Sequence, residues 1–321
     1  MTGPATAAGA TGADPMRVID MTDTPEGFAS AFHEIGDVRL HVRTGGRAGA
    51  PPLLLLHGFP QTGALWRRVA QRLAADFFLV MPDLRGYGAS SKPAGLPDHA
   101  NYSKRALAAD MHALMDRLGF GRYGVVGHDR GGRVAHRLAL DQPSAVSRLC
   151  VIDIVPTLDM YEATDLAFAR AYYHWFFLVQ PPPLPERLIG GDPVFYLHHT
   201  LGGWGSRGTG FIEPEALAEY ERGFCNPAGI HGACEDYRAS ASIDLDHDRA
   251  SRAAGDRIAC DLLVLWGERG VVGRLYRPLE RWQAQCAGTV GGQAMLAGHF
   301  IPEELPEATA EAVRRFFDAG A

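Results

Sequence analysis

The chain has 321 residues, of which 46% are hydrophobic and 21% charged, which is ordinary for a soluble globular protein and excludes a disordered, fibrous or membrane-embedded one. Its 31 basic and 37 acidic residues give a net charge of −6, so the basic excess needed for nucleic-acid binding is missing. Five scattered cysteines without a C-x-x-C pair predict neither a disulfide framework nor a zinc site, and we expect a cytoplasmic protein.

The N-terminal residues 1–19 are predicted to be a disordered tail. They are rich in Ala, Gly and Thr at their start and lack the apolar core of a signal peptide. No apolar stretch approaches the ~20 residues of a membrane-spanning helix, so no membrane partner is expected.

Hydrophobic patterning then predicts a hairpin over residues 32–43, followed by alternating strands and helices. The expected strands are 53–56, 77–81, 123–126 and 149–154, and the expected helices are 64–75, 103–118 and 133–140. Such alternation is typical of an α/β fold with a mostly parallel sheet flanked by helices.

The alternation stops between residues 155 and 245, where aromatic residues cluster and a proline-rich stretch follows. We interpret this segment as an inserted helical cap. The core pattern resumes with a strand at 262–266, a helix at 275–285, a weak strand around Ala294 and a last helix at 302–317. The predicted core is therefore 20–154 and 246–321, and the string Asp246-His247-Asp248 is expected to be a solvated loop without metal-ligand spacing.

The most informative segment is Y-G-V-V-G-H-D-R-G-G-R at residues 123–133, where an apolar strand runs through a G-x-D-x-G turn into a helix. This is the nucleophile elbow of α/β hydrolases with Asp129 in place of serine, and small flanking residues suit its tight turn. An ionised carboxylate attacks saturated carbon without activation and leaves an ester. The alternative role for Asp129 is that of a helix cap.

Hydrolysis of that ester requires a base and an oxyanion site. The candidate base is His299, between the weak last strand and the final helix, and its orienting acid is Asp153, with Glu268 as the alternative. The backbone N–H groups of Phe59, in the H-G-F-P segment at 57–60, and of Arg130 are the expected oxyanion donors. His57 in the same segment is expected to be structural.

Together with Asp153 and His299, the segments G-H-D-R-G-G-R, H-G-F-P, His174-Trp175 and D-Y-R at 236–238 resemble the fluoroacetate dehalogenases. The resemblance covers nearly the whole chain after the tail. It implies an α/β-hydrolase fold and a hydrolase that converts 2-haloacetates to glycolate and halide through a covalent aspartyl ester, without metal or organic cofactor.

Arg130 and Arg133 lie on one face of the predicted helix, and a guanidinium suits bidentate binding of a carboxylate. In the family that the chain resembles, both positions hold the carboxylate of the haloacetate, and His174, Trp175 and Tyr237 form the halide site. Trp204 matches a further cap tryptophan in a glycine-rich setting. Alternatively, the arginines lie at the surface and increase solubility or form a salt bridge with an acidic cap residue, and the aromatic residues pack the cap.

The expected partner is thus a small anionic 2-haloacid, and a homodimer is expected from the size of the chain. An epoxide hydrolase shares nucleophile and base but needs cap tyrosines, for which Tyr172, Tyr173 and Tyr237 are candidates. The paired arginines argue against neutral epoxides. A hydrolase-like binding protein without catalytic activity is the remote third alternative.

Overall fold

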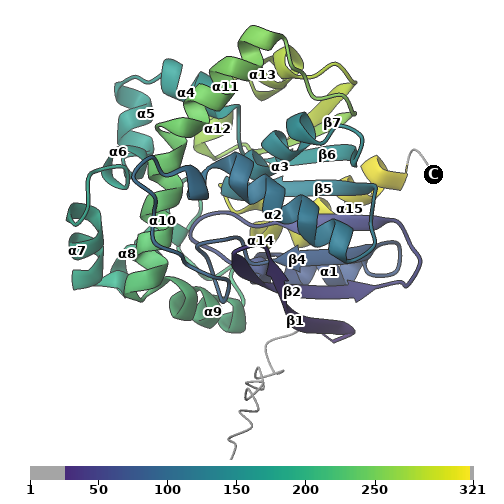
Figure 1. Ribbon diagram of the computed structural model, residues 1–321, viewed down its shortest axis with the longest axis horizontal. Helices are drawn as coiled ribbons and strands as arrows, with labels where there is room; N and C mark the ends of the chain where they lie inside the picture. The colour runs from purple at the N-terminus through teal and green to yellow at the C-terminus, as the bar shows by residue number, and fades with distance from the viewer. Residues whose placement is uncertain (1–25, 319–321) are drawn as a thin grey trace, which may run out of the picture.

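The computed structural model describes residues 26–318, and a mostly parallel sheet lies at its centre (Figure 1). Its eight strands are hydrogen-bonded in the order β1-β2-β4-β3-β5-β6-β7-β8. They are β1 (Phe28–Ile35), β2 (Val38–Gly46), β3 (Pro52–Leu56), β4 (Phe78–Pro82), β5 (Tyr123–His128), β6 (Val146–Ile152), β7 (Leu262–Gly267) and β8 (Val290–Met295). β1 and β2 form the predicted antiparallel hairpin, β2 is antiparallel to β4, and the later pairs are parallel.

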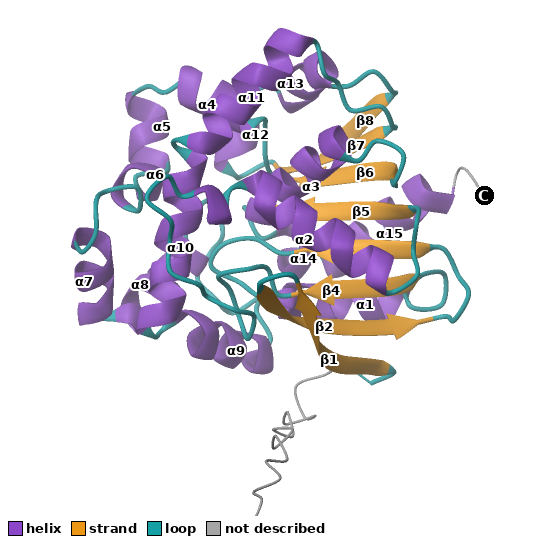
Figure 2. Ribbon diagram, viewed as in Figure 1, coloured by secondary structure: helices purple, strands orange, loops and turns teal. Residues whose placement is uncertain are grey.

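Helices cover both faces of the sheet (Figure 2). α2 packs against α3 on one face, and α1 packs against α15 on the other. The inner strands β3 and β5 are buried almost throughout, because parallel strands lie between two helical layers, and this burial explains why neither alternates apolar and polar residues. The core helices are η2 (Gly63–Trp66), α1 (Arg67–Leu73), η3 (Ala100–Tyr102), α2 (Lys104–Arg117), α3 (Arg130–Asp141), α12 (Val271–Leu275), α13 (Pro278–Gln285), α14 (Ile301–Glu304) and α15 (Pro306–Asp318).

Three predicted helices are each divided in the structure. The helix expected at 64–75 begins as the 3-10 turn η2, capped by the Thr62 side chain, before α1 follows. The helix expected at 275–285 is divided between the end of α12 and α13, and α13 has Pro278 in its first turn. The last helix is interrupted between α14 and α15 at Pro306, because proline has no N–H to donate to the preceding turn.

The segment predicted as a cap is helical, and residues 155–245 contain no strand. Its helices are α4 (Thr157–Glu162), α5 (Leu166–Ala171), α6 (His174–Phe177), α7 (Leu184–Gly191), α8 (Pro193–Leu201), α9 (Pro214–Phe224), α10 (Pro227–Ser240) and α11 (Ile243–Ala254). α11 runs through the predicted boundary between residues 245 and 246, and Gly255 is its C-cap. The string Asp246-His247-Asp248 therefore lies in a helix, and the prediction of a loop was wrong, because a polar helix face and a solvated loop have similar composition.

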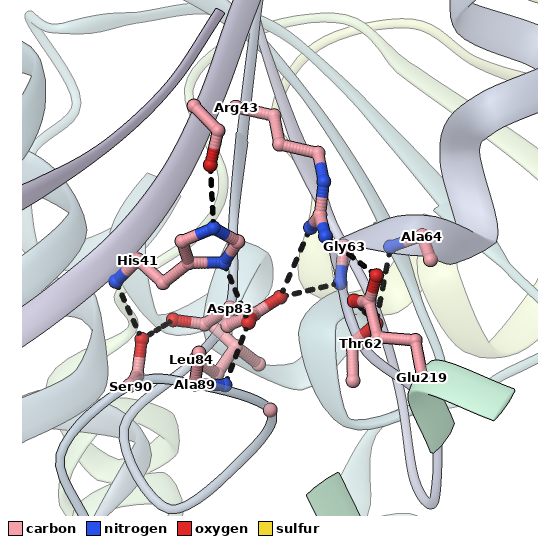
Figure 3. Close-up of polar contacts among 12 residues, drawn as sticks. His41, Arg43, Thr62, Gly63, Ala64, Asp83, Leu84, Ala89, Ser90 and Glu219 are labelled. Carbon is pink, nitrogen blue, oxygen red and sulfur yellow. Dashed lines mark hydrogen bonds and ion pairs between the residues drawn. The ribbon is translucent and has the colours of Figure 1, made fainter. Parts of the chain in front are cut away.

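A buried ion network holds the cap helix α9 on the core (Figure 3). Glu219 of α9 accepts hydrogen bonds from Arg43 of β2 at 2.6 Å and from the Thr62 hydroxyl. Asp83, which follows β4, lies 3.6 Å from the Arg43 guanidinium and 2.9 Å from the His41 ring. Glu219 of the cap is buried, and its partners Arg43 and Thr62 belong to the core. Paired charges therefore hold the cap on the core in addition to apolar packing.

The predicted tail at residues 1–19 lies outside the described part of the chain. Within residues 26–318, no helix has the length and hydrophobicity needed to cross a bilayer.

Candidate active site

Asp129 lies at the turn between β5 and α3, where its backbone has φ 47° and ψ −116°. A side chain on Gly127 would collide with the backbone of the first turn of α3, and one on Gly131 would collide with the end of β3. Glycine is therefore required on both sides of Asp129, and the positive φ is a strained conformation of the kind found at functional sites. The turn directs the Asp129 carboxylate to the carboxyl end of the sheet, beneath the cap.

His299 and Asp153 lie beside this carboxylate. The Nε2 atom of His299 is 3.8 Å from Oδ2 of Asp129, and its Nδ1 is 2.6 Å from Oδ2 of Asp153. Asp153 also accepts a hydrogen bond from the backbone N–H of Gly267 at 2.9 Å. Glu268, the alternative acid, is exposed. The structure thus brings the three predicted residues together and orients Nε2, which has no partner among residues 26–318, toward Asp129.

The charges around these groups favour an ionised Asp129 and a basic His299. Burial would raise the pKa of Asp129, but His299, His128 and the two arginines keep it below its usual value. Burial would likewise lower the pKa of His299, but the hydrogen bond and charge of Asp153 raise it above its usual value. An anionic nucleophile beside an imidazole of increased basicity suits attack followed by base-assisted hydrolysis.

One of the two predicted oxyanion donors already contacts the carboxylate. The backbone N–H of Phe59 donates to Oδ1 of Asp129 at 2.9 Å. The N–H of Arg130 lies in the first turn of α3, next to Asp129, and its role as second donor stays a prediction. His57 accepts a hydrogen bond from the backbone N–H of Leu84 at 2.9 Å and is fully buried, which suits a structural role.

The guanidinium of Arg130 differs from our expectation of a free bidentate fork. Its Nε and Nη2 bind the carboxylate of Asp236 in α10 at 2.8 and 3.1 Å, so the salt bridge to an acidic cap residue that we gave as the alternative is present. Asp236 also accepts from Tyr87 at 2.6 Å and from Lys104. Only Nη1 of Arg130 is left without a partner among the described residues.

Arg133 has a different environment, because its hydrogen-bond partners among residues 26–318 are uncharged. Its Nη1 donates to Thr157 at 2.9 Å and to the Val155 carbonyl at 3.2 Å, and its Nη2 approaches the Met160 sulfur at 3.2 Å. Its Nε has no partner within residues 26–318. Burial and the charge of Arg130 lower the pKa of Arg133, so an anion bound beside it would relieve an unfavourable buried charge.

The aromatic residues predicted for halide binding lie against the two arginines. The guanidinium of Arg130 lies 4.2 Å from the ring centre of Tyr237, and that of Arg133 lies 4.7 Å from the Trp175 ring. The rings of His174 and Tyr237 are 5.5 Å apart. The Tyr237 hydroxyl and Nδ1 of His174 are buried and have no partner among the described residues. Burial lowers the pKa of His174 to about 3, so its ring is neutral at pH 7.

Trp204, in the cap, packs against both the aromatic residues predicted for halide binding and the catalytic histidine candidate. Its ring centre is 4.5 Å from that of His174 and 5.1 Å from that of His299. Tyr172 is buried beside Trp204, whereas Tyr173 is partly exposed, with 42% of its surface accessible. Of the three tyrosines considered for epoxide protonation, the structure therefore brings Tyr172 and Tyr237 to the site.

The sequence did not reveal the buried residues that hold Arg130 and the His299 backbone in place. Asp236 was noted only within the D-Y-R motif, and Lys104 carried no signal because a lone lysine at a helix start is usually exposed. His128 was missed as well: its Nε2 donates to the His299 carbonyl at 2.9 Å. Within residues 26–318, no three His, Cys, Asp or Glu side chains are grouped so that they could hold a metal ion.

The parallel sheet, the helical cap and the acid at the strand–helix turn define an α/β hydrolase, and a family model of the α/β hydrolase fold matches residues 51–207. The chain is 46% identical over 291 residues to the fluoroacetate dehalogenase of Burkholderia sp, which covers 91% of this chain and 94% of that relative. The chain therefore belongs to the fluoroacetate dehalogenase family of α/β hydrolases. The resemblance and fold class expected from the sequence are confirmed.

Other relatives include epoxide hydrolases. The soluble epoxide hydrolase of Corynebacterium sp. (strain C12) is 33% identical, covering 88% of this chain and 95% of the relative. Among solved structures, an α/β hydrolase from Nostoc sp PCC 7120 has a TM-score of 0.87 and 49% identity, covering 90% of this chain and 98% of that one. A structure described as an epoxide hydrolase from Pseudomonas aeruginosa has a TM-score of 0.85 and 45% identity, covering 92% and 96%.

Proposed function

We propose that this protein is a haloacetate dehalogenase that hydrolyses the carbon–halogen bond of 2-haloacetates, fluoroacetate included, to glycolate and halide. The observation that carries the proposal is two guanidinium nitrogens without a hydrogen-bond partner among residues 26–318, Nη1 of Arg130 and Nε of Arg133, in the helix that begins directly after Asp129. Buried cationic donors without partners are costly unless an anion occupies the site. The similarity to a fluoroacetate dehalogenase supports the same substrate class.

In the first step, Oδ2 of Asp129 attacks the substrate's α-carbon. The new carbon–oxygen bond forms as the carbon–halogen bond breaks, and the halide leaves with the bonding electron pair. Oδ2 suits this role because Oδ1 accepts the Phe59 N–H. We assign the substrate carboxylate to Arg130 Nη1 and Arg133 Nε, one N–H from each arginine rather than a bidentate fork.

The departing halide needs donors in a site that excludes water. His174, Trp175 and Tyr237 each carry an N–H or O–H on a buried ring. Burial and the charge of Asp129 hold the pKa of Tyr237 well above its usual value, so the hydroxyl keeps its proton and remains a donor.

In the second step, Nε2 of His299 removes a proton from water, and the hydroxide attacks the carbonyl carbon of the Asp129 ester. Negative charge develops on Oδ1, where the Phe59 N–H already donates and where we place the Arg130 N–H. As this intermediate collapses, the oxygen bound to the substrate carbon takes the proton of the His299 imidazolium and leaves as glycolate, and loss of the remaining water proton to solvent restores the Asp129 carboxylate. Asp153 stabilises the imidazolium that forms.

Two measurements test this function. A fluoride or chloride electrode should record halide release from fluoroacetate, chloroacetate and 2-fluoropropionate. A single turnover in heavy-oxygen water should place label in the Asp129 carboxylate, as found by peptide mass spectrometry. Label that appears only in glycolate would contradict the covalent route, and absence of halide release from every haloacid would contradict the function.

The second candidate is an epoxide hydrolase, favoured by the 33% identity to the soluble epoxide hydrolase of Corynebacterium and by the buried Tyr172 and Tyr237 near Asp129. Either hydroxyl would protonate the epoxide oxygen as Asp129 opens the ring. Styrene oxide separates the candidates, because an epoxide hydrolase forms the diol and releases no halide from haloacetates. If neither styrene oxide nor any haloacetate is converted, the result would favour a hydrolase-like binding protein without catalytic activity.

We further propose that the protein acts as a homodimer in the cytoplasm. α7 and α8 carry exposed apolar side chains, with Leu188 62% and Phe195 65% accessible, and a second copy of the chain would cover them. The five cysteines are free, which suits a reducing compartment. Light scattering coupled to size-exclusion chromatography should give twice the mass of the chain, and a Phe195→Ser variant should shift the mass toward that of the monomer.

A further inference from the structure

Glu304, the last residue of α14, supports the loop that carries His299. Its carboxylate accepts the backbone N–H of Gly298 at 2.8 Å and that of Phe300 at 3.1 Å, the residues on either side of His299. The side chain is only 8% accessible, so neither bond competes strongly with water. One carboxylate thereby fixes the backbone on both sides of the histidine.

The same carboxylate also binds a loop of the cap. The Ser206 hydroxyl donates to Oε1 of Glu304 at 2.7 Å, and Nη2 of Arg269 lies 3.1 Å from Oε2. Arg269 follows β7, and its Nη1 donates to the Leu296 carbonyl at 2.9 Å. Three separate segments, the loops after β7 and β8 and the cap loop before α9, therefore meet at Glu304.

Two glycines allow these three backbones to approach so closely. A side chain on Gly298 would overlap the backbone of Gly205 and Ser206, and a side chain on Gly205 would overlap the Arg269 carbonyl. Gly205 also has φ +91°, which favours glycine. These glycines allow the cap loop and the histidine loop to approach closely, and the bond from Ser206 to Glu304 joins the two loops at that approach.

The cap loop held in this way lies between α8 and α9 and contains Trp204, whose ring packs against those of His174 and His299. Trp204 has φ 51°, an unfavourable conformation for a bulky side chain, so neighbouring contacts must maintain it. Besides the contacts of the Trp204 ring itself, the next two residues are held by Arg269, which donates to the Gly205 carbonyl, and by Glu304, which accepts from Ser206.

We propose that Glu304 is a positioning residue that holds the loop of His299 against the cap loop of Trp204. It thereby positions both the base of the second step and the Trp204 ring beside His174. This inference rests on the proposed function, because it takes His299 as the base. Glu304 touches no reacting atom and acts through His299 and Trp204.

Because Glu304 is charged, its replacement should change the pKa of His299. Replacement of a residue that only supports the loop would leave this pKa unchanged. Burial lowers the pKa of His299, whereas Asp153, Asp129 and Glu304 raise it, in decreasing order. Among the described residues, the rings packed against His299 are those of Trp204 and Phe300, which are uncharged, and of His128. Burial lowers the pKa of His128 and of His174, which also interacts with His299, to about 3, so both are neutral at pH 7. Removing the charge of Glu304 also leaves Arg269 uncompensated nearby, which lowers the pKa of His299 further.

The test compares Glu304→Gln with Glu303→Gln as the matched control. Glu303 is the adjacent carboxyl group, but it accepts from Gln61 and Tyr220 and not from the histidine loop. Burial raises the pKa of Glu303 to about 8, so E303Q makes the same change of side chain without removing a negative charge at pH 7. Histidine-labelled full-length protein is titrated by NMR without substrate, and the His299 signal is identified by its loss in His299→Gln. We expect the His299 midpoint to move toward acid in E304Q and to stay at the wild-type value in E303Q.

Activity should change in parallel. The acid limb of the pH profile for haloacetate turnover should move toward lower pH in E304Q, and kcat should fall roughly tenfold because the base is less well placed. E303Q should keep the wild-type profile. An unshifted His299 midpoint together with an unchanged kcat in E304Q would overturn the inference.

Ser206→Ala separates the cap contact from the support of the histidine loop. It removes only the bond from the cap loop, so the His299 midpoint should stay in place while acrylamide quenches Trp204 fluorescence more strongly, measured as the difference from a Trp204→Phe background. We expect kcat/KM to fall about fivefold, as for loss of one hydrogen bond. Unchanged quenching would overturn the lock between the loops, even if E304Q fails to fold.

The dehalogenase function and the positioning role of Glu304 can be contradicted independently of each other. Wild-type protein that releases no halide, but in which E304Q still shifts the His299 midpoint, would contradict the dehalogenase function and support the role of Glu304. Halide release by the wild type, together with an unshifted His299 midpoint and unchanged kcat in E304Q, would support the dehalogenase function and contradict the role of Glu304.

Discussion

Replacing Asp236 by asparagine tests the buried charge chain that holds Arg130 in place. Asp236 of α10 accepts from both Nε and Nη2 of Arg130, from Lys104 and from the Tyr87 hydroxyl. Lys104 in turn lies 3.4 Å from the carboxylate of Asp244 in α11. Opposite charges from core and cap thus alternate along Arg130, Asp236, Lys104 and Asp244.

The size of the effect follows from the burial of these groups. Asp236 and Arg130 have no accessible side-chain surface, and removing one partner of such a pair costs about 3–5 kcal/mol. Asparagine keeps one acceptor oxygen but turns an NH2 group toward two cationic donors. We expect a loss near the lower end, about 3 kcal/mol, which is a large part of the ~5–15 kcal/mol of a typical domain.

Urea unfolding followed by tryptophan fluorescence and far-ultraviolet circular dichroism measures the loss. With a slope of about 3 kcal/mol/M, the midpoint should fall by about 1 M urea. The matched control is Asp246→Asn in α11, whose carboxylate is 75% accessible and pairs with Arg249 at the surface, so its midpoint should not change.

The dependence on pH gives a second check. Burial would raise the pKa of Asp236, but Arg130 and Lys104 hold it well below its usual value. A depressed folded-state pKa stabilises the protein above the unfolded pKa of about 3.9, and this stabilisation is lost as the pH falls below that value. The difference between wild type and D236N should therefore be constant from pH 5 to 8 and shrink below about pH 4. A D236N midpoint equal to that of D246N would refute the reasoning.

Three further predictions concern the proposed chemistry. Asp129→Asn should lower halide release by roughly 10⁴-fold or more, measured with a halide electrode, because the amide is not an anionic nucleophile; unchanged release in pure protein would contradict the role of Asp129. His299→Gln should accumulate the ester, seen in the intact mass as one added carboxymethyl group after mixing with fluoroacetate, and unmodified mass with normal first-turnover halide release would argue against it. Arg133→Met should reduce kcat/KM for haloacetates by about 10–100-fold, since it removes a charge-assisted bond worth ~1.5–3 kcal/mol, and an unchanged value would show that Arg133 does not bind the carboxylate.

The local features of this protein could be read from its sequence. Short apolar runs marked the parallel strands, because strands buried on both faces need no alternation of polar residues. The glycines around Asp129 marked the elbow, because only glycine fits where α3 packs against β3 and β5. The late histidine and the acid after β6 could be proposed because chain order in this fold leads both to the same edge of the sheet.

What the sequence could not decide concerns groups distant along the chain that meet only after the cap docks. Arg130 and Asp236 are 106 positions apart, and no local pattern shows that Asp236 occupies the guanidinium fork that we expected to be free. Chain order favoured Asp153 over Glu268, but only the packed structure shows that Asp153, after β6, lies 2.6 Å from the His299 ring while Glu268, after β7, is exposed. Periodicity and turn motifs encode local backbone conformation, whereas the pairing of buried charges depends on how the cap and the core pack together.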